Sequence, residues 1–409
     1  MDFKLIASSE GKVQVWERAG CVFLVLLGLM CCVSEAGSRN AVRILLLLSA
    51  VTVAFLPAFR QRLRISLKLA SGMAFLWFLL ALSAFWGGNW EEAVGTASFS
   101  LGYTFLLVSI VPLMAGEKVW IHRIILALMA SLFVNDLVVF REAWQGEFRA
   151  SGIWKYWLDA AMAYSICLPV FLSLLLVDRE FKYRWAAALS FILGWAALIL
   201  TNSRGAWIGA AAGCLAVLFF ARKTISRKKI LGVCLVVICL LGAFSIAKPQ
   251  QAQRLYSIVE FGSEKHPEGE RLLIWTAAVQ MIEDYPLTGV GLHNFHKFYQ
   301  EHYLSPKSVE GALNHAHNNF LQIWAENGLV AFLVYTALNL YLFWLGWKNR
   351  KSLYGNMLFS MMLSFTIFGM TIYIVNQYGV MRIFYLCLGI CLCGLRLEAC
   401  GENDKIIGR

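Results

Sequence analysis

The residues best suited to acid–base chemistry are histidines, and six of the seven in this chain of 409 residues fall in one hydrophilic segment. An imidazole with a pKa near 6.5 can take up or release a proton at physiological pH. The segment runs from Lys248 to His317 and contains His266, His293, His296, His302, His315 and His317. This clustering predicts a reaction site in the segment, and the alternative is a hydrophilic loop that is histidine-rich by chance.

Two arginines could hold a phosphorylated substrate on the same side of the protein. Arg204 follows Asn202 and Ser203 at the start of an apolar block, where either residue could cap a helix. A guanidinium beside a helix N-terminus combines two features that attract anions. Arg271 opens a predicted loop helix. The alternatives are a snorkelling side chain for Arg204 and a solvated surface charge for Arg271.

Long apolar blocks must position these residues. The chain is 59% hydrophobic and 15% charged, whereas soluble domains are about 25% charged, so a soluble enzyme and a disordered chain are both excluded. The net charge is +11. The basic residues lie between the apolar blocks and form no basic stripe, which argues against nucleic acid as a partner. Blocks of about 20 apolar residues predict membrane-spanning helices. Twelve are predicted, at 18–36, 42–59, 67–86, 93–114, 120–140, 157–178, 184–201, 205–221, 230–247, 328–346, 353–375 and 381–396.

The distribution of Lys and Arg orients these spans. Every connection on one side is basic, so both termini are predicted to be cytoplasmic and the long segment to face outward. The first block is interpreted as a retained helix and not as a signal peptide. Cysteines are absent from the long segment, so neither a disulfide framework nor a thiolate metal site is expected there. Three regions are predicted: spans 1–9 in residues 1–247, a helical loop subdomain with the catalytic segment in 248–327, and spans 10–12 with a short cytoplasmic tail in 328–409.

Within the loop, helical spacing predicts a helix over 269–284 that Pro286 ends. Its apolar face is predicted from Leu272, Trp275, Val279 and Ile282. A second stretch shows the same spacing in His317, Leu321, Trp324 and Gly328. If the helix of the tenth span reaches back to His317, this imidazole lies at the outer end of that span and faces the bundle.

Three blocks of the sequence resemble the lipopolysaccharide O-antigen ligases, within the larger ligase/polymerase superfamily. The first is Ser203-Arg204-Gly205-Ala206 at the start of a span. The second joins Arg271 and Trp275 to Pro286, Gly289, Gly291 and Phe295. The third is Ala316-His317-Asn318 with Leu321, Glu326 and Gly328. Their order, with one long outer loop late in a twelve-span chain, makes the resemblance specific, whereas the first block alone is weak.

The resemblance implies an all-α polytopic membrane glycosyltransferase fold of the GT-C type. It implies transfer of O-polysaccharide from undecaprenyl diphosphate to a sugar of lipid A–core, at the periplasmic face of the bacterial inner membrane. His317 would be the catalytic base, and Arg204 and Arg271 would bind the diphosphate. The reaction would invert the anomeric configuration and need no cofactor and no metal, since His315 and His317 lack a third ligand at close spacing. Secondary candidates are His315, Asn318, Trp275 and Arg382, the last flanking the final outer turn.

Three alternatives remain open. An O-antigen polymerase would use the same lipid-linked donor, although polymerases tend to carry two sizeable outer loops. A protein O-oligosaccharyltransferase of the same superfamily is usually a longer chain. A twelve-helix secondary transporter would place its binding residues near the bilayer midplane, often in repeated halves, and the sequence shows no internal repeat.

Overall fold

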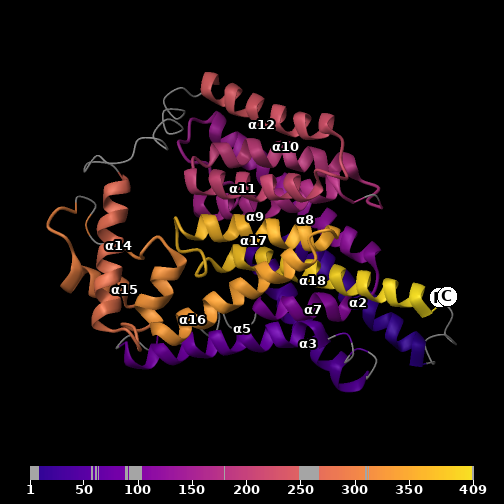
Figure 1. Ribbon diagram of the computed structural model, residues 1–409, viewed down its shortest axis with the longest axis horizontal. Coiled ribbons are helices and arrows are strands. Elements are labelled where there is room, and N and C mark those ends of the chain that lie inside the picture. Colours follow the sequence, from indigo (N-terminus) through magenta and orange to yellow (C-terminus); the bar gives the residue numbers. More distant parts are fainter. Residues whose placement is uncertain are drawn as a thin grey trace.

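Apolar helices occupy all twelve of the predicted blocks, which confirms the all-helical polytopic class. The computed structural model describes residues 9–56, 59, 62, 64–87, 91, 104–178, 180–247, 267–308, 311 and 313–407, and no strand occurs among them. The bundle helices (Figure 1) are α2 (Ser9–Met30), α3 (Glu35–Phe55), α5 (Arg64–Ser83) continued by η1 (Ala84–Trp86), α7 (Leu107–Met114) preceded by η3 (Thr104–Leu106), α8 (Lys118–Trp144), α9 (Trp157–Leu176), α10 (Arg184–Leu200), α11 (Arg204–Ala221), α12 (Arg227–Ala247), α16 (Asn319–Lys348), α17 (Leu353–Gly369) and α18 (Tyr378–Ile407).

Nine helices of the described chain are long and apolar enough to cross a membrane. Three shorter apolar helices, Thr104–Met114, Arg184–Leu200 and Leu353–Gly369, fill the remaining predicted positions. Residues 93–103 of the predicted fourth span lie outside the described residues. Several apolar helices of this length make the chain a multi-pass membrane protein.

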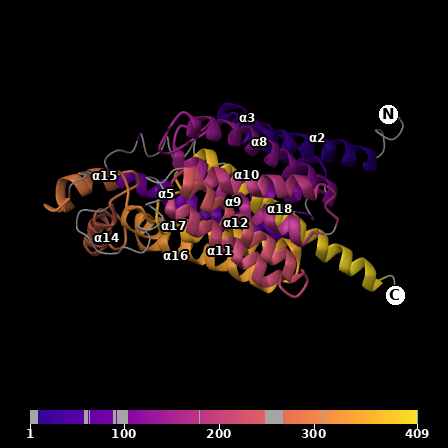
Figure 2. The same cartoon turned by 90° about the horizontal axis from the view of Figure 1, so that it is seen from above.

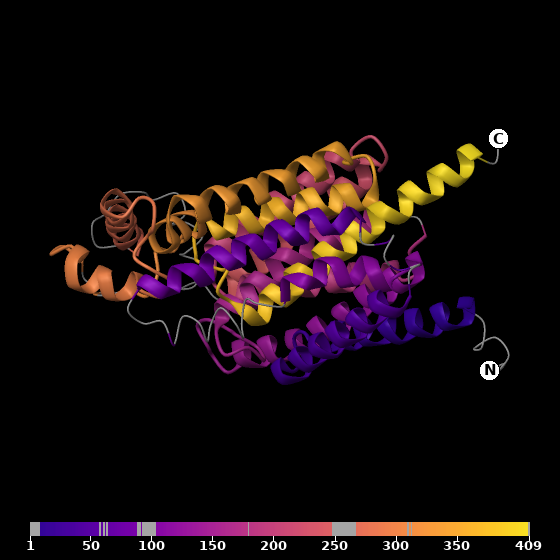
Figure 3. The same ribbon diagram turned by 90° about the horizontal axis from the view of Figure 1, so that it is seen from below.

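The two ends of the chain lie at the same end of the bundle. The start of α2 and the end of α18 project together, while α14 (Pro267–Asp284) and α15 (Phe295–Phe298) lie at the opposite end (Figures 2 and 3). This arrangement agrees with the prediction that both termini share one side and the loop subdomain the other. Which side faces the cytoplasm stays a prediction from the basic residues.

Close packing of α11 on α17 fixes the start of α11, where Arg204 lies. A Cβ atom on Gly209 would lie 2.8 Å from the Ser364 carbonyl oxygen, and one on Gly213 would lie 2.7 Å from that of Ser360. Glycines four residues apart on one face allow two helix backbones to approach closely inside a membrane. The start of α11 is therefore held against the end of α17.

The loop subdomain has its own apolar core, but the predicted face of its helix is partly wrong. Leu272 is 62% exposed and Val279 is exposed too, whereas the core contains Ile274, Ala278 and Met281. The helix packs through small as well as large residues, so its buried face is rotated from the stripe of bulky side chains. The predicted helix itself is confirmed as α14, and Pro286 follows its end.

A turn anchors the subdomain to α16 and interrupts that helix. Gly328 has φ 78° and ψ 179°, and the backbone N–H of Leu329 donates to Pro286 O at 3.0 Å. The N–H groups of Val290 and Gly291 donate to the carbonyls of Ala325 and Glu326 at 2.9 and 2.8 Å. The predicted tenth span thus starts at a real break, and an outer helical segment precedes it.

Candidate active site

The His-x-His turn places two imidazoles against one another directly before α16. The ring centroids of His315 and His317 lie 4.2 Å apart, with the ring planes inclined at 70°. The backbone N–H of His317 donates to Nδ1 of His315 at 3.3 Å, so neutral His315 carries its proton on Nε2. Two neighbouring imidazoles in a defined arrangement can position and exchange a proton.

Backbone geometry aims His317 and corrects its predicted position. His317 has φ 50°, in the left-handed region, and Asn318 caps α16 through its Oδ1 atom, which accepts from the N–H groups of Phe320 and Leu321 at 2.9 and 3.3 Å. The prediction that His317 continues a helical face with Leu321 is therefore wrong, because the helix begins only at Asn319. Its place at the mouth of α16 is unchanged.

Two polar residues in the first turn of α16 hold the His-x-His turn. Gln322 Oε1 accepts from the buried Ala316 N–H at 2.6 Å. Asn319 Oδ1 accepts from the Ile374 N–H at 2.8 Å, which ties the start of α16 to the turn between α17 and α18. Sequence reasoning did not single out Asn319 or Gln322. The sequence does offer a signal for them, namely two amide side chains three residues apart in a mostly apolar helix. Amides that become buried in such a helix need hydrogen-bond partners.

Burial keeps both imidazoles neutral. It lowers the pKa of His315 to about 4. Burial lowers the pKa of His317 to about 3, and the neighbouring His315 imidazole and the charge of Arg271 lower it as well. Among the described residues, no group hydrogen-bonds to the buried Nδ1 atom of His317. This nitrogen is available to accept a proton or to meet a substrate.

Arg271 lies close enough for its charge to act on His317. It extends from the second turn of α14, next to Glu270, whose buried carboxylate accepts from the Ser308 hydroxyl at 2.8 Å. Trp275, one turn further along α14, packs against the apolar core of the loop subdomain. The structure therefore brings Arg271 and His317 together from segments more than forty residues apart.

The start of α11, which carries Arg204, borders the turn that joins α17 to α18. Arg204 is the first residue of α11, after Asn202 with its left-handed φ of 57°. A Cβ atom on the next residue, Gly205, would lie 2.1 Å from Thr371 Oγ1 in that turn. The ring of Tyr373, two residues further, lies 6.1 Å from the ring of His315. The start of α11 and the His-x-His turn thus border one common turn.

The predicted cap of α11 is only partly right. Ser203 is the N-cap residue, as predicted, but within the described structure its side chain makes no capping hydrogen bond. Asn202 instead donates from Nδ2 to the Phe148 carbonyl at 3.1 Å, which joins it to the loop after α8. Asn202 precedes the N-cap position with a left-handed backbone, and its Oδ1 atom makes no capping hydrogen bond among the described residues.

Arg382 lies deeper in the bundle than a residue that flanks an outer turn would suggest. It is 1% exposed, and its Nη1 donates to the Glu35 carbonyl at 3.1 Å while Nη2 lies 3.8 Å from Glu35 Oε1. These contacts join α18 to the start of α3. They describe a structural role, and a role for Arg382 in substrate binding stays a prediction.

Two of the other histidines make contacts elsewhere in the loop subdomain. His296 Nδ1 lies 3.3 Å from the Leu313 carbonyl, within the loop subdomain, and His302 is exposed beside Glu301 at 3.7 Å. His293 has a left-handed φ of 64°, and His266 lies outside the described residues. Of the six clustered histidines, His315 and His317 therefore form the one pair in ring contact among the described residues.

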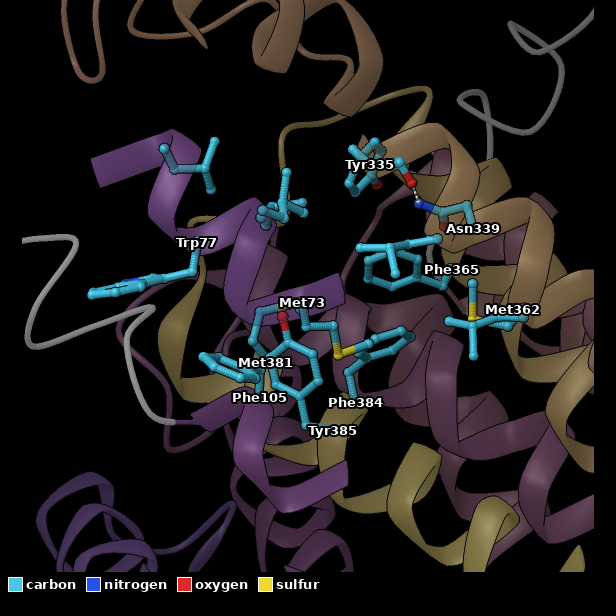
Figure 4. A pocket seen from close by; sticks show the side chains of 15 residues that line it. Met73, Trp77, Phe105, Tyr335, Asn339, Met362, Phe365, Met381, Phe384 and Tyr385 are labelled. Atoms are coloured by element: carbon cyan, nitrogen blue, oxygen red, sulfur yellow. Dashed lines mark hydrogen bonds between the residues drawn. The ribbon is translucent and has the colours of Figure 1, made fainter. Parts of the chain in front are cut away.

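An apolar pocket adjoins the polar site. It lies between α5, α16, α17 and α18, with a cavity volume of about 60 Å³ (Figure 4). Tyr335 lines the pocket, and its hydroxyl accepts from Asn319 Nδ2 at 3.2 Å. Val375, in the turn that contacts His315, lines it as well. A polar head at the His-x-His turn could therefore continue into an apolar chain among Trp77, Phe365 and Phe384.

Within the part of the chain that the structure describes, no three His, Cys, Asp or Glu side chains come together in a group that could hold a metal ion. Independence of metal and of other cofactors stays a prediction.

Comparison with known proteins covers the central part of the chain. Residues 189–336 match a protein-family model described as O-antigen ligase, and this segment includes Arg204, Arg271 and His317. A protein of Haemophilus influenzae (strain Rd), described as uncharacterized, is 25% identical over 167 residues. That match covers 38% of this chain and 42% of the relative, so the chain spans about two fifths of the relative's length. The resemblance found in the sequence is thereby confirmed over residues 189–336.

Proposed function

We propose that this chain, which carries the O-antigen ligase family domain at residues 189–336, transfers a lipid-linked O-polysaccharide to a sugar of lipid A–core. The donor would be undecaprenyl-diphosphate-linked glycan, and the reaction would occur at the periplasmic face of the bacterial inner membrane. The family comprises membrane enzymes of the glycosyltransferase type. One observation carries the proposal: two neutral imidazoles lie beside Arg271 next to an apolar pocket.

In the proposed reaction, a hydroxyl oxygen of the acceptor sugar attacks the anomeric carbon of the donor. The bond from that carbon to the diphosphate oxygen breaks, and the lipid diphosphate leaves with the electron pair. The hydroxyl proton passes to the imidazole of His317. A single displacement of this kind inverts the anomeric configuration.

The charges suit these steps. Arg271 and Arg204 would hold diphosphate oxygens through charge-assisted hydrogen bonds, which stabilise the charge that builds on the leaving group. The low pKa of His317 makes the free imidazole a weak base, but a bound diphosphate would add negative charge beside it and raise that pKa. Proton transfer contributes typically ~10²–10⁴-fold, so positioning of donor and acceptor would supply much of the acceleration.

The apolar pocket supports a lipid-linked donor. A polyisoprenoid chain offers only apolar surface, and the apolar lining of the pocket between α5, α16, α17 and α18 could contact a short part of it. Its junction with the polar site at Tyr335 suits a ligand with a charged head and an apolar tail. The other partners in this proposal are the bilayer and the lipid A–core acceptor. Both termini would be cytoplasmic.

The test is transfer by the purified full chain in liposomes that contain the lipid-linked glycan. With lipid A–core as acceptor, a ligase forms the joined glycolipid. An O-antigen polymerase would instead lengthen the lipid-linked glycan, and a protein O-oligosaccharyltransferase would need a protein acceptor. A secondary transporter would accumulate labelled solute without any glycolipid product.

His317→Ala is the decisive variant, and His302→Ala is its matched control because His302 is an exposed histidine of the same subdomain. We expect His317→Ala to insert and fold but to lose transfer by at least about 10²-fold, the lower limit of general-base catalysis. His302→Ala should retain transfer. Near-normal activity of His317→Ala would remove this residue as the base.

A further inference from the structure

A second groove lies at the end of the bundle remote from the candidate active site. It runs between the C-terminal end of α9 and the N-terminal ends of α10 and α12. Arg204 starts α11 at the active-site end, so the helices before and after α11 both begin at the other end. Apolar side chains such as Phe191, Val233 and Val236 line this groove together with two cations, Arg184 and Lys229.

The groove is open at Gly232, where α12 carries no side chain to fill it. Phe244, near the far end of α12, is buried and packs edge-on against Trp207 with ring centroids 6.4 Å apart. Towards the start of the same helix, a Cβ atom added to Gly232 would meet nothing within 4 Å. Gly232 lines the groove. An apolar slot therefore lies between α10 and α12, with Arg184 and Lys229 among its lining residues.

The cations lie where a phosphate would meet them. Arg184 is the first residue of α10 and Lys229 the third of α12, so each lies beside a helix N-terminus that favours an anion. The guanidinium of Arg184 donates through Nη2 to the carbonyl of Asp178, which limits its motion. The Asp178 carboxylate itself lies 2.9 Å from His122 Nε2, and so it is already engaged.

Exposed aromatic residues mark the level of the bilayer surface at this point. Tyr183 and Trp185 flank Arg184 in sequence, and Trp185 is 69% exposed. Such residues are enriched at the boundary between lipid headgroups and acyl chains. We infer from these aromatic residues that the cations lie at headgroup depth and that the apolar slot extends from them towards the acyl chains.

We propose that this groove binds one anionic diacyl phospholipid. Its phosphate would lie between Arg184 and Lys229, and one acyl chain would follow the slot past Gly232 and Val236. Basic pockets between membrane helices bind acidic headgroups by this chemistry. The site is independent of the proposed glycosyl transfer, and it would fasten α12 to the rest of the bundle.

Native mass spectrometry of the purified full chain tests the site. The protein in detergent is titrated with phosphatidylglycerol or with phosphatidylcholine of the same acyl chains, and bound lipids are counted. We expect one phosphatidylglycerol to remain bound preferentially. Arg184→Gln and Lys229→Gln should each weaken its retention about fivefold, as expected for one cation near an anionic lipid. Lys228→Gln, on an exposed neighbour outside the groove, is the charge control.

Two glycine variants distinguish lipid bound in the groove from lipid bound elsewhere on the protein surface. Gly232→Leu would fill the slot and should abolish preferential retention. Gly242→Leu is the matched control, because a Cβ atom there also meets nothing within 4 Å and Gly242 does not line the groove. If Gly232→Leu fails to fold, the two charge variants still decide the question.

Several results would overturn the proposal. They are equal retention of both lipids, unchanged retention in Gly232→Leu, an equal loss in Gly242→Leu, and displacement of the lipid by inorganic phosphate alone. The last would identify a free-anion site. Binding of a second copy of the chain in place of the lipid, seen as a doubled mass, would also contradict it.

Discussion

The low pKa of His317 has a direct consequence for the pH dependence of transfer. A general base must be neutral to accept a proton, so activity falls as pH drops through the pKa of the base. An unperturbed imidazole with a pKa near 6.5 would be roughly one tenth neutral at pH 5.5. Burial lowers the pKa of His317 to about 3 in the free protein, so nearly all of it is neutral at that pH.

The expected magnitude follows from these two fractions. For the donor, kcat/KM reports the free enzyme, and we expect it to change less than about twofold between pH 7.5 and 5.5. An unperturbed base would instead lose about tenfold over the same interval. The value of kcat should fall at a higher pH than kcat/KM, because bound diphosphate raises the pKa of His317 in the complex.

The assay is initial-rate transfer in liposomes at low and at saturating donor, across pH 5 to 8. A diphosphate esterified at both ends does not titrate in this range, so the substrate does not mimic the effect. His315→Asn provides a second reading, since it removes one of the groups that lower the pKa of His317. A tenfold decline in kcat/KM with a midpoint near 6.5 would refute the buried, neutral His317 that the geometry describes.

Four further outcomes are expected. Arg204→Lys should cut kcat/KM for the donor strongly, because a point charge does not reproduce the planar fork of a guanidinium, and unchanged donor kinetics would contradict this. Gln322→Leu would leave the buried Ala316 N–H unpaired, at a cost of about 1–3 kcal/mol in the free energy of unfolding. The thermal unfolding midpoint of this variant should therefore fall. Gln322→Glu is the control, because it retains an oxygen that can accept from this N–H. Gly328→Ala would force a side chain into φ 78° with its Cβ atom 2.0 Å from the Leu287 carbonyl, so it should lower that midpoint further, and a neutral effect would show that the turn moves freely. Added chelator should leave transfer unchanged, and its abolition would establish a metal requirement.

Much of this protein follows from the sequence because helices in a membrane are specified locally. Lipid offers the backbone no hydrogen-bond partners, so each apolar block must be a helix wherever it packs. Pro286 marks the end of α14 for another local reason, because proline has no backbone N–H and disfavours helix at the residue before it. The residue types also predict a proton acceptor in the loop, since few side chains other than histidine suit that task near neutral pH.

Only the tertiary structure decided how these residues act together. Leu272 and Val279 look like core residues at helical spacing, yet the packing of the loop subdomain leaves them exposed. His317 lies in a left-handed turn and not on the helix, because Asn318 caps α16 after it. The low pKa of His317 depends on burial and on Arg271, a residue distant in sequence, and desolvation by distant segments leaves no periodic trace in a chain.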